Sequence, residues 1–214
     1  MINTDLSSKY NVLVACEFSG IVRDAFIHAG HTAISCDLLP TEKPGPHYQG
    51  NVLDILYQNW KLIIAHPPCT RLANSGIRWL NNPPAGKTVA EMWDELYTGA
   101  RFYKKFIEHP CNMIAIENPI MHIYAQAFVG NHTRHIIQPW QFGEPVFKAT
   151  GFWLKGLPPL TPTNILIPPE KGTEEYKKWS KIHFMLNTSD RAKNRSRTFR
   201  GVAQAMVHQW GKYL

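Results

Sequence analysis

The segment 11-NVLVACEFSG-20 decides the fold of this 214-residue chain. Residues 11–16 are almost all apolar, as expected of a strand that is covered on both faces in a parallel sheet. Gly20 then opens a helical pattern that closes at Gly30, a residue type favoured just past a helix C-terminus. A buried strand that passes through a short glycine turn into a helix predicts the first unit of an α/β protein.

Further short apolar runs follow this first unit along the chain. They cover residues 32–36, 62–65, 113–116, 136–139 and 151–154. Strands that alternate with helices pair in parallel with right-handed crossovers. We therefore expect an α/β, Rossmann-like fold with a mostly parallel sheet flanked by helices, in a single domain over residues 1–214.

Two more helices carry clear start signals. Thr88 and Glu91 form a T-x-x-E capping box ahead of a long apolar stripe. Thr198 is the expected cap of a last helix that Gly211 ends. Residues 156–169 are rich in proline, and we expect them to be an extended surface loop.

Composition excludes a disordered chain and a membrane-spanning one. Hydrophobic residues make up 44% of the chain and charged residues 18%, enough to bury a core. The longest apolar run, Val12 to Cys16, is far too short to cross a bilayer, and the polar first residues lack a signal-peptide pattern. The four cysteines have no zinc-binding spacing, so we expect reduced thiols and no metal. We expect a cytoplasmic protein without a membrane partner.

The positive charge is concentrated at the C-terminal end. Residues 1–150 hold twelve Lys and Arg against twelve Asp and Glu, and residues 151–214 hold eleven against four. The whole net charge of +7 therefore lies in the last part of the chain. A basic block on a neutral body favours a polyanionic partner such as nucleic acid, although a solvated basic tail has the same composition.

Acidic residues follow three of the predicted strands, where ligands bind in open parallel sheets. The first strand leads into 17-EFSG-20, whose glycine lets a ligand approach the backbone. Asp37 ends the second strand, and Asp54 follows residues 50–53. Each is by itself an ordinary loop carboxylate; together they predict a nucleoside site.

A cysteine and a glutamate follow two other strands. Residues 62–65 run into 66-HPPCT-70, where two prolines direct Cys69 outward at the mouth of the sheet. Glu117 comes directly after residues 113–116, at the same edge. We expect Cys69 to act as a nucleophile and Glu117 to exchange a proton with the molecule that it attacks, against the alternatives of a buried thiol and a solvated carboxylate.

In order and spacing, these segments resemble the cytosine-C5 DNA methyltransferase family, over about residues 11–156 and again over 195–211. The resemblance implies a methyltransferase fold and S-adenosyl-L-methionine as methyl donor. It implies cofactor contacts from Phe18, Ser19, Gly20, Asp37, Asp54 and Pro67. It also implies that DNA is bound by Arg71, Arg191, Lys193, Arg195 and Arg197.

The same resemblance implies a mechanism. Cys69 would add to carbon 6 of the pyrimidine, and Glu117 would hydrogen-bond or protonate N3. Carbon 5 would then take the methyl group, a base would remove its proton, and elimination would release Cys69. A base in a duplex would first have to flip out of the stack.

The chain departs from the family pattern at several points. Val22 stands where a second glycine is usual, Thr70 where glutamine is usual, and Ala73 where serine is usual. Residues 138–148 lack the Q-R-R-x-R segment, and the cations left to replace its arginine are Arg134, Lys148, Arg195 and Arg197.

The interval 157–194 is a short loop and basic insertion in place of the family's target-recognition domain, as in compact, phage-type members. That size is compatible with a helper subunit or a homodimer, and with action inside an infected host cell. Two other functions stay open: methylation of a free pyrimidine nucleotide, and a non-catalytic protein that binds cofactor or nucleic acid on a decayed methyltransferase scaffold.

Overall fold

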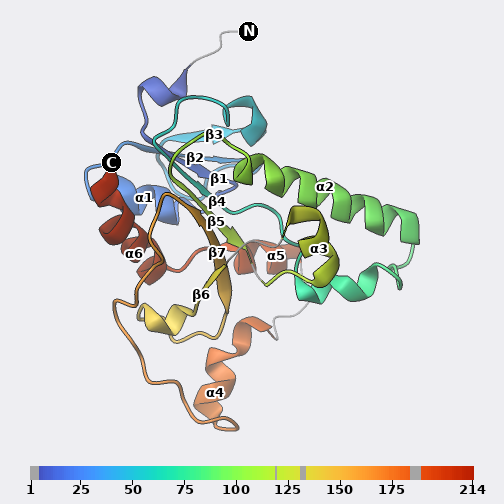
Figure 1. The fold of residues 1–214 in the computed structure, drawn as a ribbon. Coiled ribbons are helices and arrows are strands. Elements are labelled where there is room, and N and C mark those ends of the chain that lie inside the picture. The colour runs from blue at the N-terminus through green and yellow to red at the C-terminus, as the bar shows by residue number, and fades with distance from the viewer. Residues whose placement is uncertain (1–4, 119, 131–133, 184–188) are drawn as a thin grey trace.

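The computed structural model describes residues 5–118, 120–130, 134–183 and 189–214. Its centre is a sheet with the strand order β3-β2-β1-β4-β5-β7-β6 (Figure 1). The strands are β1 Val12–Ala15, β2 Ala33–Asp37, β3 His47–Gln49, β4 Leu62–Ala65, β5 Ile114–Asn118, β6 His135–Ile137 and β7 Thr150–Lys155. The first five strands have the order of a Rossmann-like sheet, so the predicted fold class is confirmed.

The strands from β3 to β5 are parallel, and β7 lies antiparallel between β5 and β6. Parallel strands are covered on both faces, which explains why all four residues of β1 are buried. Alternate residues of β1 enter the two hydrophobic cores: Leu13 and Ala15 on one face, Val12 and Val14 on the other.

Helices cover both faces of the sheet (Figure 1). Helices α1 (Ile21–His28) and α6 (Arg200–Trp210) pack against each other and join the core of one face. Helices α2 (Val89–Ile107) and α3 (Ile123–Val129) pack together on the other. Helix α4 (Glu174–Trp179) lies in the expected insertion 157–194, and α5 (Ser189–Ser196) begins in it and ends two residues beyond it. In the part of the chain that the structure describes, no helix is long and apolar enough to span a bilayer.

Most of the expected elements form near their predicted positions. The capping box is present, because the Thr88 hydroxyl accepts from the Glu91 backbone while the Glu91 carboxylate accepts from that of Thr88. The prediction of Thr198 as the cap of the last helix is wrong, since α6 begins at Arg200. Its exposed amide at Gly201 is satisfied instead by the carboxylate of Glu144, at 3.2 Å.

Candidate active site

The carboxyl ends of the parallel strands bring the predicted site residues to one edge of the sheet. Glu17 to Gly20 follow β1, Asp37 ends β2, His66 to Cys69 follow β4, and Glu117 lies in β5. Because β4 pairs with β5 and Ala65 lies opposite Ile116, the next residues, His66 and Glu117, are neighbours. Strand pairing thus brings together two residues that are 51 positions apart in the sequence.

His66 and Glu117 form a hydrogen-bonded pair. The His66 Nδ1 atom lies 3.0 Å from Glu117 Oε2, and both side chains are largely buried. The bond to a carboxylate requires the proton on Nδ1. The other ring nitrogen, Nε2, is buried without a hydrogen-bond partner among the described residues. His66 was not among the predicted site residues, although its place directly after a buried strand is the signal that marks it.

Glu117 is held in its charged form. Burial by itself would raise the pKa of this carboxyl, but the hydrogen bond with His66 and the charges of Lys148 and His66 outweigh it, so the pKa lies below its ordinary value. Glu117 is therefore a carboxylate at neutral pH. It accepts protons and hydrogen bonds, and it donates to a ring nitrogen only after it has first taken up a proton.

Cys69 lies at the start of a tight turn, where its carbonyl accepts hydrogen bonds from the amides of Leu72 and Ala73, both at 2.9 Å. Its side chain is partly exposed and is not packed into the core. Burial raises the pKa of the thiol, as does the charge of Glu117, and the charges of Lys148 and Arg195 offset part of that rise. The thiol is therefore protonated at neutral pH, under the opposing charges of one carboxylate and two cations.

Lys148 is the cation best placed at this site. With Glu117, Thr198 and Phe199 it lines a small hollow. Its ammonium group donates to the backbone carbonyl of Arg195 at 2.8 Å, which ties the segment before β7 to the end of α5.

Of the other cations left open by the sequence, Arg134 and Arg197 have partners elsewhere. Arg134 contacts the sulfur of Met121 at 3.1 Å, and Arg197 binds Glu42. Lys148 and Arg195 are therefore the two whose charges act on Cys69.

The loop after β1 is held by Glu17, the first of the three acidic residues predicted at strand ends, which here has a structural role. Its buried carboxylate accepts from the amides of Val22 (2.7 Å) and Arg23 (3.3 Å) and from the Ser19 hydroxyl (3.1 Å). These contacts satisfy the first turn of α1 from inside the loop. Gly20 has a φ of +70°, and a Cβ there would lie 2.4 Å from the Arg23 guanidinium. The local geometry therefore requires glycine.

The other predicted cofactor residues line the same edge. Asp37 accepts from the amide of Leu39 at 2.9 Å, and Asp54 accepts from the Tyr48 hydroxyl at 3.3 Å. Burial and the charges of Asp37 and Asp54 together raise the pKa of the Cys36 thiol to about 12. Within the described ranges, neither carboxylate forms a salt bridge.

Carboxylates without a salt bridge at an open sheet edge fit the hydroxyl and amino groups of a nucleoside. Pro67, in the Cys69 loop, is buried, and Phe18 is only 6% exposed, so these two predicted cofactor residues present little side-chain surface. Leu38, by contrast, is 73% exposed beside Asp37, an apolar surface that suits a nucleobase. The exposed surface at the carboxyl ends of β2 and β3 therefore offers carboxylate acceptors beside an apolar side chain.

The residues predicted to bind nucleic acid fall into two groups. Arg71 follows the Cys69 loop and is bound by Glu95 of α2 at 2.5 Å. The others lie in or just after α5, where Lys193 and Arg197 bind Glu42 and the Arg195 carbonyl accepts from Lys148. Arg191 belongs to α5, but its side chain lies outside the described part of the structure.

Comparisons with known proteins found a likeness to solved structures but none to a family model or a curated sequence. A solved structure titled "Structure Analysis of Entamoeba histolytica methyltransferase EhMeth" is similar, with a TM-score of 0.42 and 17% sequence identity. The match covers 77% of this chain and 58% of that chain, so this chain spans little more than half of the other protein's length.

Proposed function

We propose that this chain is an S-adenosylmethionine-dependent methyltransferase that methylates carbon 5 of cytosine in DNA. What supports it is the position of Cys69 after β4 and of Glu117 in the neighbouring strand β5, together with Lys148, which lines one hollow with Glu117. The charges of Glu117 and Lys148 both act on the Cys69 thiol. A pyrimidine carbon 5 is a poor nucleophile until a group adds at carbon 6. A thiol, a carboxylate that takes a proton and a cation that offsets negative charge are the groups this addition requires.

The first step joins the sulfur of Cys69 to carbon 6 of the ring. The ring's double bonds shift, so that a C4–C5 double bond forms and the electron pair released from C4=N3 goes to N3. The proton lost by Cys69 passes through the Glu117 carboxylate to N3, which keeps the addition neutral overall. Lys148 stabilises negative charge while sulfur and proton are separated.

Carbon 5 is then the nucleophilic end of an enamine. S-adenosylmethionine, when bound, supplies the methyl group to that carbon. A base removes the carbon-5 proton as the bond from sulfur to carbon 6 breaks, and Glu117 takes back the N3 proton. Gly20, Asp37 and Asp54 would hold the cofactor, and a target in a duplex would have to leave the base stack.

The decisive experiment measures transfer of tritium from labelled S-adenosylmethionine to duplex DNA, single-stranded DNA and free dCMP. We expect transfer to DNA, and its loss in Cys69→Ala with cofactor affinity kept within a few-fold. Cys111→Ala is the matched control, because that thiol is buried against the carbonyl of Trp60, at 3.2 Å, and takes no part in the reaction.

A second readout tests the covalent step directly. DNA that carries 5-fluorocytosine blocks removal of the carbon-5 substituent, so the adduct should accumulate on the peptide that contains Cys69 and be visible by mass spectrometry. Transfer to dCMP but not to DNA would mean that the substrate is a free nucleotide. The small insertion around α4 and α5 favours that outcome, because it offers little surface for a polymer. Cofactor binding without transfer to any acceptor would contradict the proposed activity.

A further inference from the structure

Glu42, in the connection between β2 and β3, binds two of the cations assigned to nucleic acid. Its carboxylate accepts from Arg197 through two bonds, Nη2 to Oε1 at 2.6 Å and Nε to Oε2 at 3.0 Å. Lys193 Nζ lies 3.2 Å from Oε1. This two-bond geometry is also the way in which arginine binds a phosphate group. A carboxylate thus occupies the positions that phosphate oxygens would take.

Hydrogen bonds from Arg23 and to Phe18 hold the loop that contains Glu42. Arg23 is fully buried and donates to the Thr41 hydroxyl and the Lys43 carbonyl, both at 3.1 Å. The amide of Glu42 also donates to the carbonyl of Phe18 at 2.9 Å. The backbone around Glu42 is therefore held by contacts that do not involve the basic segment.

The same two cations lie against the predicted cofactor loop. Lys193 Nζ is 5.3 Å and the Arg197 guanidinium 5.9 Å from the centre of the Phe18 ring. The Glu42 side chain nevertheless remains 27% exposed, so an incoming anion can reach the ion pairs from solvent. The hydrogen bond from Arg197 holds the pKa of Glu42 below its usual range, so the carboxylate is charged at neutral pH.

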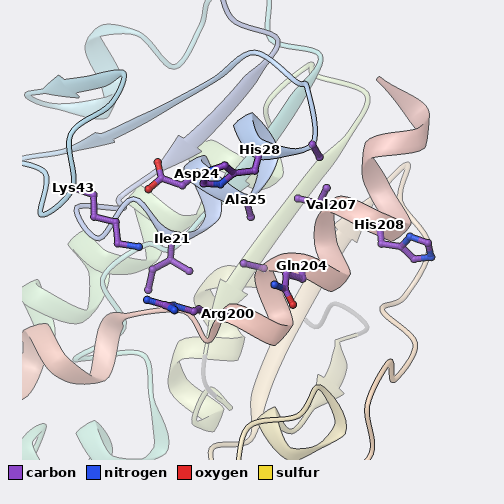
Figure 2. Close-up of a pocket in the computed structure, with 11 residues that line it drawn as sticks. Ile21, Asp24, Ala25, His28, Lys43, Arg200, Gln204, Val207 and His208 are labelled. Atoms are coloured by element: carbon purple, nitrogen blue, oxygen red, sulfur yellow. The ribbon is translucent and has the colours of Figure 1, made fainter.

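Further cations continue this surface without an acid of their own. Figure 2 shows Lys43 and Arg200 at the end of the groove between α1 and α6 that lies nearest Ile21. Among the described residues, neither cation has a side-chain hydrogen bond or salt bridge. The groove's own acid, Asp24, is paired with Arg23 at 2.7 Å. An anionic chain that reaches α5 would find these cations beside it.

We propose that Glu42 is an internal counter-ion which occupies a phosphate-binding position between Lys193 and Arg197, and that the backbone of a nucleic acid displaces it. The inference rests on the proposed function for the class of ligand, a phosphodiester chain. It adds that the free protein carries its own competitor for that ligand. Binding then releases the basic segment from Glu42 and links it to phosphates, beside the loop expected to hold the cofactor.

The experiment measures binding of a short fluorescent DNA duplex by anisotropy at several salt concentrations, for the wild-type chain and Glu42→Gln. We expect the variant to bind about threefold to tenfold more tightly at low salt, with a salt dependence steeper by about one phosphate contact. Glu42→Asp keeps the charge and should stay near the wild type.

Glu174→Gln is the matched control, because it removes the same charge from an exposed glutamate whose partner among the described residues is Lys177 on α4. Equal gains in Glu42→Gln and Glu174→Gln would mean that net charge alone is responsible, and weaker binding by Glu42→Gln would mean that Glu42 positions the cations for DNA. Either result overturns the inference. Thermal unfolding of each variant checks that the fold is kept.

Elution from immobilised heparin separates this test from the proposed function. Heparin is a polyanion that requires no methyl transfer, so Glu42→Gln should elute at higher salt than Glu174→Gln even if neither variant methylates DNA. Equal elution would overturn the role of Glu42 while leaving the transfer assay to decide the activity.

Discussion

At the scale of single residues, the site depends on a balance of charge around Cys69. Burial and Glu117 raise the pKa of the thiol, and Lys148 and Arg195 lower it by a smaller amount. The same Lys148 helps to keep Glu117 ionised. Lys148 therefore favours the thiolate form of Cys69 and the carboxylate form of Glu117. In the proposed reaction Cys69 loses its proton and Glu117 takes that proton up.

Lys148→Gln tests this balance. Loss of the positive charge favours the neutral thiol, so the pKa of Cys69 should rise, and alkylation of Cys69 at neutral pH should slow by about threefold to tenfold. Peptide mass spectrometry of iodoacetamide-treated protein across a pH series gives the rate for each cysteine.

Lys155→Gln is the control for that substitution. Lys155 also donates to a backbone carbonyl, that of His109, at 2.8 Å, but lies at the other end of β7. Its loss should leave the Cys69 rate unchanged, and an equal slowing in both variants would contradict the role given to Lys148.

At the scale of elements, the turn from β1 into α1 brings the backbone at Gly20 close to the Arg23 side chain. Glu17 satisfies the amides of the first helical turn, and Gly20 adopts a left-handed backbone directly against the Arg23 side chain. Arg23 in turn holds the loop that carries Glu42. Gly20 thus leaves space for the Arg23 side chain, which holds the loop that contains Glu42.

Gly20→Ala should lower the free energy of unfolding by roughly 2–4 kcal/mol, because it adds a steric clash to the cost of a left-handed backbone. Gly30→Ala is the comparison: its φ is +90° and its added Cβ would meet nothing within 4 Å, so only the backbone cost applies. Urea unfolding of both variants measures the difference. Equal losses would show that Arg23 moves aside without cost.

At the scale of the whole molecule, α6 completes the fold by joining distant parts of the chain. Trp210 is fully buried, its ring centre lies 6.0 Å from that of Phe152 in β7, and its indole nitrogen donates to the carbonyl of Pro158 at 2.9 Å. The helix also packs along α1, so the C-terminal helix covers strands from both halves of the sheet.

Trp210→Ala should therefore cost about 3–5 kcal/mol of unfolding free energy through lost burial and the cavity left behind. Tyr213→Ala, at a ring that is 49% exposed just beyond the helix, should change stability by less than about 0.5 kcal/mol. Thermal or urea unfolding of the two variants measures the difference. A small loss of unfolding free energy in Trp210→Ala would mean that α6 is peripheral to the core.

The amino-acid sequence by itself determined the elements whose signals are local. The buried runs of β1 and β4 and the capping box at Thr88 follow from neighbours a few residues apart. The sequence pattern predicts Glu117 directly after its strand, but this residue lies inside β5, because pairing with β7 extends that strand to Asn118. Short elements such as β3 and α3 escaped prediction, because three polar edge residues and seven residues of helix carry too little periodicity.

Only the tertiary structure decided which charges meet. The bond between His66 and Glu117 needs the register of β4 against β5, and the pairing of Glu42 with Arg197 joins residues 155 positions apart. No local pattern encodes such contacts, because they depend on where whole loops and helices come to rest. The local sequence pattern predicts which apolar residues are buried, whereas the packing of distant segments determines which residue pairs with a given charge.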